Sequence, residues 1–131
     1  MKKGHVDISN LNIPPEQAEF ETAKYFADLG KDIIFIRPSS IPNQHRPDIQ
    51  MDGLEWEIKC PEGRSKRTIE NNIRAAEKQS HYIIIDLRRI KIPEKKCLSE
   101  IEINFRTKPG IKRILVITKE LKLIEFPPQI N

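Results

Sequence analysis

Residues 46–60 read Arg46-Pro47-Asp48-Ile49-Gln50-Met51-Asp52-Gly53-Leu54-Glu55-Trp56-Glu57-Ile58-Lys59-Cys60 and predict a tight β-hairpin. Asp52-Gly53 is a strong turn signal, because a type I′ turn needs positive φ at both central residues. A two-residue loop also fixes the register of the two strands. It predicts that Ile49 lies opposite Trp56 and that Asp48 lies opposite Glu57.

Alternation of side chains along each strand divides this hairpin into an apolar and a polar face. The polar face carries Asp48 and Glu57 side by side, with Lys59 next along the same strand. Like charges placed opposite each other destabilise a sheet, so the pairing needs an explanation, and a divalent metal ion would supply one. The apolar face is predicted to contain Ile49, Met51, Leu54, Trp56, Ile58 and Cys60.

The composition is that of a soluble globular chain. It has 131 residues, 37% hydrophobic and 32% charged, which fits one domain spanning residues 1–131. The net charge of +4 is a mild indication of a polyanionic partner. No apolar run is long enough for a signal peptide or a membrane span, so we expect a cytoplasmic site of action and no membrane partner.

The apolar periodicity predicts a mixed sheet flanked by helices. Residues 1–13 are expected to be irregular. Helices are predicted at 15–29, 68–79 and 94–106, and further strands at 32–37, 82–87, 112–118 and 121–126. Buried strands joined by helices indicate an α/β fold.

An acidic residue, Glu19, lies on the inner face of the first predicted helix. At 100° per residue it falls in the middle of the stripe formed by Thr22, Ala23, Phe26 and Leu29. It is therefore expected to point toward the sheet. The alternative is a place at the rim near the helix N-terminus, where acids are favoured in any case.

Carboxylates at Glu19, Asp48 and Glu57 would suit Mg²⁺ or Mn²⁺, with the carbonyl of Ile58 as a further ligand. Such a metal ion would lower the pKa of a bound water and offset charge on a phosphodiester. Lys59 would orient that water, act on it as a base or stabilise the pentavalent phosphorane, and the sequence leaves these roles open. The alternative is a solvated face on which Lys59 pairs with Glu57.

Polar residues after the hairpin are candidates for substrate binding. The basic loop before the second helix and that helix itself supply Arg64, Lys66, Arg67, Thr68, Asn72, Lys78 and Gln79. The cationic side chains among them would contact phosphates. The alternative is that they only keep the protein soluble. Arg88 and Arg89 are interpreted as part of a solvated basic rim.

The sequence resembles the PD-(D/E)xK nuclease superfamily. The residues that carry this resemblance are Pro47-Asp48, Glu57-Ile58-Lys59 and a helical Glu19. Its αβββαβ core matches residues 15–87 in order. The resemblance implies a restriction-endonuclease-like, three-layer α-β-α fold with a mixed central sheet. It also implies metal-dependent phosphodiester cleavage, with Asp48 and Glu57 as metal ligands, Lys59 as the catalytic lysine and Glu19 as a supporting acid.

Within that superfamily, residues 14–126 are similar to the C-terminal toxin domains of CdiA proteins. The similarity is carried by Glu19-Phe20-Glu21-Thr22-Ala23, Arg46-Pro47-Asp48, Trp56-Glu57-Ile58-Lys59 and Gln79-Ser80 with Ile83-Ile84-Ile85-Asp86-Leu87. These domains are nucleases of contact-dependent growth inhibition, and several cleave tRNA. The resemblance therefore implies a nucleic acid substrate, tRNA before DNA, and allows a cognate immunity protein as a partner.

Two alternatives stay open beside the tRNA-cleaving toxin. One is a DNA nuclease of the same fold, of the junction-resolvase or repair type, and the other is a non-catalytic interaction protein. Family toxins are the tails of very large secreted proteins, whereas this sequence starts at Met1. That difference bears on the toxin role more than on the cleavage chemistry.

Overall fold

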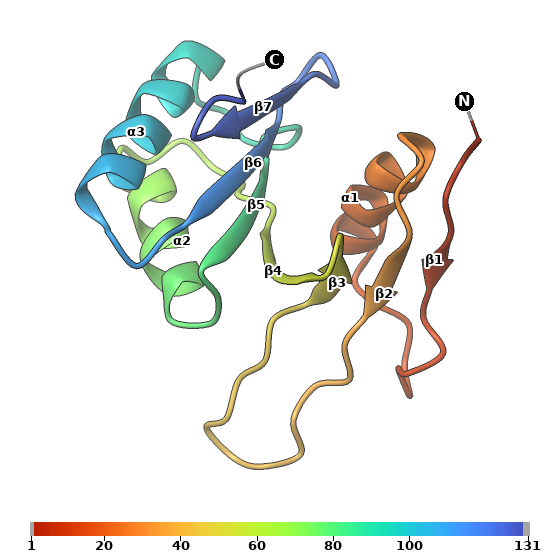
Figure 1. Ribbon diagram of the computed structural model, residues 1–131. Coiled ribbons are helices and arrows are strands. Elements are labelled where there is room, and N and C mark those ends of the chain that lie inside the picture. The colour runs from red at the N-terminus through yellow and green to blue at the C-terminus, as the bar shows by residue number, and fades with distance from the viewer. Residues whose placement is uncertain (1, 130–131) are drawn as a thin grey trace.

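A computed structural model describes residues 2–129. The elements follow each other along the chain and are labelled in Figure 1. They are β1 (Val6–Asp7), α1 (Gln17–Asp28), β2 (Ile33–Phe35), β3 (Ile49–Met51), β4 (Leu54–Lys59), α2 (Thr68–Glu77), β5 (Tyr82–Asp86), α3 (Glu94–Thr107), β6 (Arg113–Ile117) and β7 (Leu123–Phe126).

The described strands form one seven-stranded mixed sheet whose spatial order follows the chain, from β1 to β7. β4, β5 and β6 are parallel neighbours, while β2–β3, β3–β4 and β6–β7 are antiparallel. Helix α1 lies apart from α2 and α3, which pack together on the other side of the strands (Figure 1). The predicted three-layer α/β fold is confirmed.

Residues 46–60 form the predicted hairpin. Ile49 pairs with Trp56, Gln50 with Glu55, and Met51 with Leu54. The turn residues Asp52 and Gly53 have φ values of 55° and 75°, as a type I′ turn requires. On the apolar face Ile49, Met51, Trp56 and Ile58 are buried, while Leu54 and Cys60 are partly buried. The register expected from the two-residue loop is therefore correct.

Helix α1 ends as the sequence predicts, at a glycine. Gly30 has φ of 95° and donates its N–H to Ala27 O at 2.9 Å, while Lys31 N bonds Phe26 O at 3.0 Å. These two bonds form a Schellman motif, which satisfies the last carbonyls of the helix. The inner face holds Thr22, Ala23, Phe26 and Ala27.

Two local expectations were wrong. Residues 1–13 contain a short strand, β1, which pairs in parallel with β2 through Val6 and Ile33. Its two residues are too few to produce a periodic signal. Leu29 does not belong to the inner stripe of α1: it is exposed at the C-cap, where the chain already turns away from the helix.

Each face of the sheet has its own core. One cluster, under α1, includes Phe26, Trp56 and Ile84, and the other, under α2 and α3, includes Ile73, Ile83 and Ile101. Neighbouring residues of β5 thus point to opposite cores, which explains its continuous apolar run. No helix within residues 2–129 has both the length and the apolarity to cross a membrane.

Candidate active site

Asp48 is fixed by the hairpin backbone. It directly precedes β3, and its N–H donates to Trp56 O at 2.9 Å. Its carboxylate Oδ2 accepts a hydrogen bond from the Ile58 N–H at 2.7 Å. The side chain therefore turns toward β4, at the level of Glu57. The predicted pairing of the two acids is present, and the bond to Ile58 holds Asp48 in place.

Glu57 is a buried acid with an unsatisfied oxygen. Its exposed fraction is 4%, and within the part of the chain that is described its Oε1 has no hydrogen-bond partner. Oε2 lies 3.5 Å from Lys59 Nζ. Leaving a buried carboxylate oxygen unpaired is costly, and functional sites are where such groups persist. The lysine therefore satisfies only one side of this carboxylate.

The acidic pair has raised pKa values. Burial, followed by the charge of Asp48, raises the pKa of Glu57 to about 8. Burial also raises the pKa of Asp48, although the hydrogen bond from Ile58 acts in the other direction. Groups that resist ionisation for these reasons favour a nearby cation, because it would offset both the repulsion and the lost hydration.

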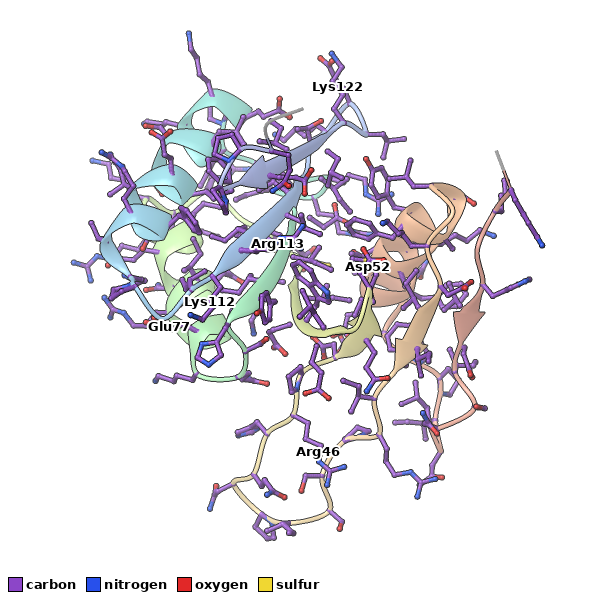
Figure 2. All side chains as sticks on the ribbon, in the orientation of Figure 1. Arg46, Asp52, Glu77, Lys112, Arg113 and Lys122 are labelled. Atoms are coloured by element: carbon purple, nitrogen blue, oxygen red, sulfur yellow. The ribbon has the colours of Figure 1, made fainter. Side chains whose placement is uncertain are left out.

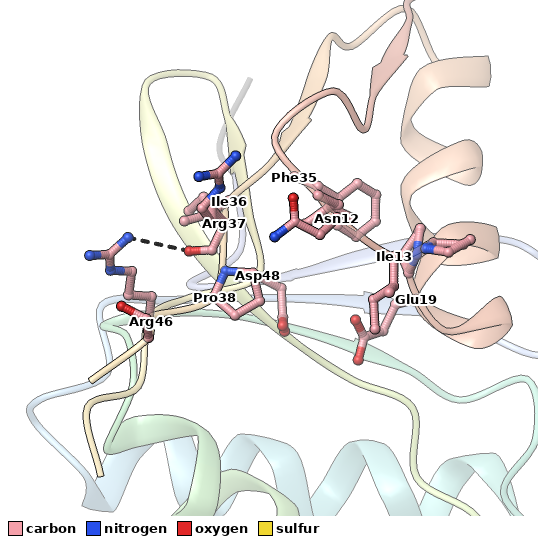
Figure 3. A pocket seen from close by; sticks show the side chains of 13 residues that line it. Asn12, Ile13, Glu19, Phe35, Ile36, Arg37, Pro38, Arg46 and Asp48 are labelled. Carbon is pink, nitrogen blue, oxygen red and sulfur yellow. Dashed lines mark hydrogen bonds between the residues drawn. The ribbon is translucent and has the colours of Figure 1, made fainter. Parts of the chain in front are cut away.

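Glu19 reaches the same site from α1. It lines a cavity of about 620 Å³ together with Asp48, and Figure 3 shows both carboxylates directed into it. Burial is the main cause that raises the pKa of Glu19 to about 7, with the charge of Asp48 adding to it. The inward direction predicted from helical periodicity is therefore what the structure shows.

Two further cavities meet at these residues. One, of about 510 Å³, is lined by Glu19, Ile58, Lys59, Cys60 and Arg89 among others. Another, of about 470 Å³, brings Gln79 beside Asp48 and Glu57.

Burial raises the pKa of the Cys60 thiol to about 11, so it is protonated at neutral pH and is a poor nucleophile.

The donor set fits a divalent metal ion with an open coordination sphere. Among residues 2–129, no three His, Cys, Asp or Glu side chains are grouped closely enough to hold a metal ion by themselves. Mg²⁺, however, commonly binds through one or two carboxylates and takes its other ligands from water and substrate phosphate. Asp48 and Glu57 supply that pair, and the unpartnered Oε1 of Glu57 is a free ligand atom.

The predicted substrate-binding residues divide into two groups. Gln79 lines the cavity with Asp48 and Glu57, and Lys78 lies beside it on the wall of a neighbouring cavity. Asn72 donates its amide to Thr68 O within α2, at 2.8 Å. Of the four remaining candidates, Thr68 is half-buried at the start of α2, while Arg64, Lys66 and Arg67 are exposed in the loop before it. None of the four lines these three cavities.

One ionic cluster near the site was not predicted. Asp86, at the end of β5, is fully buried and accepts hydrogen bonds from Thr22 Oγ1 at 2.7 Å and from Arg88 Nη2 at 2.7 Å. Arg89 lies 3.7 Å from the same carboxylate and also pairs with Glu21. Interpreting Arg88 and Arg89 as a solvated rim was therefore wrong. The sequence did carry a signal for this cluster. Asp86 ends an apolar strand, and the Arg88-Arg89 pair begins two residues later.

The fold and this site define an α/β domain with an acidic pair, buried at Glu57 and half-buried at Asp48, beside a lysine at the junction of sheet and first helix. The profile of the family described as "Contact-dependent growth inhibition CdiA C-terminal domain" matches residues 45–123, which include Asp48, Glu57 and Lys59. The chain belongs to this family.

A solved structure agrees with that placement at the level of the fold. A chain of the "CdiA-CT/CdiI toxin and immunity complex from Burkholderia pseudomallei" superposes with a TM-score of 0.65. The match covers 92% of this chain and 96% of the other, at 20% sequence identity. No curated protein matches the sequence.

Proposed function

We propose that this chain is a metal-dependent endonuclease that cleaves phosphodiester bonds, with tRNA as its preferred substrate. The observation that carries the proposal is the buried Glu57 carboxylate, whose Oε1 is unpartnered among the described residues, set between Asp48 and Lys59. A purely structural acid would have its oxygens satisfied. Membership of the CdiA C-terminal domain family supports the same reading.

Asp48 and Glu57 would hold Mg²⁺ or Mn²⁺, with the carbonyl of Ile58 as a further ligand. When bound, the ion would supply Lewis-acid stabilisation of the phosphodiester and a more acidic water. The hydrogen bond from the Ile58 N–H keeps Asp48 oriented toward the pair before any ligand arrives. This preorganisation lowers the cost of assembling the site.

Lys59 and Glu19 flank the acidic pair and would act on the substrate side. Lys59 is partly exposed and lines the same cavity as Glu19, so its ammonium can reach a phosphate or an attacking water there. The pKa of Glu19, raised to about 7, makes it suited to exchange a proton near neutral pH. Gln79 contributes an amide to the neighbouring cavity, which Asp48 and Glu57 also line.

The choice of tRNA rests on resemblance to CdiA toxin domains, and a DNA nuclease of the same fold is the competing function. The structural neighbour is a toxin and immunity complex, which supports a cognate immunity protein as a partner of this chain as well. Exposed cations on the loop before α2, including Arg64, Lys66 and Arg67, suit contacts with the backbone of either nucleic acid.

Cleavage assays on tRNA, duplex DNA and branched DNA, each with Mg²⁺, Mn²⁺ or EDTA, test this function. We expect cleavage of tRNA that EDTA abolishes, and a loss of roughly a hundredfold or more in Glu57→Gln. Glu55→Gln is the matched control, because Glu55 lies on the same face of β4 but is exposed. It should retain wild-type activity.

Three results would decide against parts of the proposal. No cleavage of any nucleic acid with either metal ion would leave the non-catalytic interaction protein as the better account. Cleavage that persists in EDTA would remove the metal ion from the mechanism. Cleavage of DNA but not of tRNA would keep the chemistry and replace the substrate.

A further inference from the structure

The cavity that Glu19 shares with Asp48 has an apolar wall that phosphodiester chemistry does not need. Phe35, which is buried, lines the cavity together with Leu11 and Ile13. Ile13 is 77% exposed, the highest fraction among the large apolar side chains of the described residues. In Figure 3 Ile13 and Phe35 face the same space as the two carboxylates. An apolar surface of this kind favours a ligand with an apolar face.

Polar side chains also line this cavity. Asn12 and Ser40 offer an amide and a hydroxyl, and Arg37 and Arg46 stand on the segment that leads from β2 to β3. Arg37 Nε donates to Asn10 O at 3.0 Å, and Arg46 Nη1 donates to Arg37 O at 3.3 Å. Each guanidinium has five N–H donors, so these bonds orient the arginines and leave donors for a phosphate.

The position of Arg46 extends this surface away from the helices. Figure 2 shows it on the long loop before β3, well separated from the side of the molecule that carries Glu77 and Lys112. Arg46 lines both the apolar-walled cavity and the cavity that contains Glu57 and Gln79. A strand of nucleic acid bound by this arginine would therefore pass the acidic pair.

We propose that the cavity of about 620 Å³ next to Asp48 is a subsite for one unpaired nucleobase, placed beside the phosphate that is cut. The inference rests on the proposed nuclease function and deepens it. A base in a duplex is stacked on both faces and cannot enter a pocket without being extruded. Ile13, Leu11 and Phe35 contact the base face, and Asn12 or Ser40 bonds its edge. The site therefore selects nucleotides in unpaired segments.

Binding of the base is tested with adenosine monophosphate and with ribose 5-phosphate, which has the same sugar and phosphate but no base. Amide chemical shifts of the protein would follow each titration. We expect adenosine monophosphate to perturb residues around Ile13 and to bind about tenfold more tightly than ribose 5-phosphate. Ile13→Ser should weaken the binding of adenosine monophosphate about fivefold and leave the binding of ribose 5-phosphate unchanged. The control is Ile103→Ser, at an exposed isoleucine on α3.

Selection is tested with oligonucleotides of one sequence, single-stranded and duplex, each as RNA and as DNA. We expect the single strand to be cut about tenfold faster than the duplex. Ile13→Ser should lower this ratio of cleavage rates, whereas Ile103→Ser should leave it unchanged. The RNA and DNA arms show which polymer supplies the base.

The outcomes separate this inference from the proposed function. The base subsite is wrong, even if nucleic acid is cut, if both probes bind equally and Ile13→Ser changes the binding of neither. Base-dependent binding at Ile13 without cleavage of any polymer supports the subsite and refutes the nuclease. If Ile13→Ser weakens only the binding of an immunity protein, the wall is a protein interface and the subsite is wrong.

Discussion

Two acidic centres, each with a buried carboxylate, lie within this small sheet, and they differ in which positive groups balance their negative charge. Asp86, at the end of β5, receives hydrogen bonds from Arg88 and Thr22 and is close to Arg89. Asp48 and Glu57 face each other with one lysine, 3.5 Å from Glu57. Burial alone would raise the pKa of Asp86, but the bonds from Arg88 and Thr22 outweigh it and the net shift is downward. The pKa values of Asp48 and Glu57 are raised.

The difference indicates what each centre is for. The Asp86 carboxylate is balanced within the chain: it ties α1, through Thr22, to the end of β5 and to the segment that follows. In this cluster only Arg89 Nη1, among the described residues, is buried without a hydrogen-bond partner. The acidic pair is incomplete, since it lacks the positive charge that would balance two carboxylates. We infer that the first centre holds the fold together, and we propose that the second, which costs folding free energy, receives a cation.

The largest expected effect is on the Asp86 cluster. Asp86→Ala removes a fully buried acid and leaves Arg88 and Arg89 without their shared partner. We expect the free energy of unfolding to fall by roughly 3 kcal/mol, measured by urea denaturation. The control is Glu70→Ala, whose exposed i,i+4 pair with Arg74 should contribute less than about 0.5 kcal/mol. Similar losses in both variants would mean that the buried cluster has no special role.

The second expected effect is a pH dependence of opposite sign at the two centres. Glu57 has an ordinary pKa near 4.5, and about 8 in the fold. Between these values the folded state holds a proton that the unfolded state has lost, so stability falls as pH rises. In EDTA we expect Glu57 to account for a loss of roughly 3 kcal/mol from pH 5 to pH 8, and a shallower slope in Glu57→Gln.

Asp86 provides the comparison in the same titration. Its folded pKa lies below the ordinary 3.8, so the stability it contributes is present above that value and is lost only as pH falls further. Asp86→Asn should therefore change the acid side of the stability profile and not its slope from pH 5 to pH 8. A wild-type profile that is flat from pH 5 to pH 8 in EDTA would contradict the raised pKa of Glu57.

The sequence predicts one of these centres and not the other, for a physical reason. Asp52-Gly53 allows only a short turn with positive φ, and that local constraint determines which residues of the hairpin are opposite each other. Asp48 and Glu57 follow from it directly. The partners of Asp86 include Thr22, which lies 64 residues away on another element. No local sequence pattern predicts a contact between residues so far apart in the chain. The same holds for the apolar-walled cavity, because residues from three separate parts of the chain line it: 11–15 before α1, Glu19 of α1, and the region from the end of β2 to Asp48.

The smallest expected effect separates charge from hydrogen bonding within the acidic pair itself. The hairpin pattern alone suggests that Asp48→Ala is neutral or stabilising, because it relieves repulsion with Glu57. The structure adds a bond from the Ile58 N–H to Asp48 Oδ2, at 2.7 Å, which alanine cannot replace. Loss of such a bond costs about 1 kcal/mol, comparable to the repulsion that is relieved.

Asp48→Asn resolves the two contributions, because asparagine keeps an oxygen acceptor for Ile58 and removes the charge. We expect Asp48→Asn in EDTA at pH 8 to be more stable than Asp48→Ala by about 1 kcal/mol, measured by urea denaturation. Both variants should lose nuclease activity, since each removes a carboxylate from the acidic pair. Equal stabilities would show that the Ile58 bond contributes little and that Asp48 is oriented by other contacts. A nuclease-active Asp48→Asn would instead remove Asp48 from the metal site.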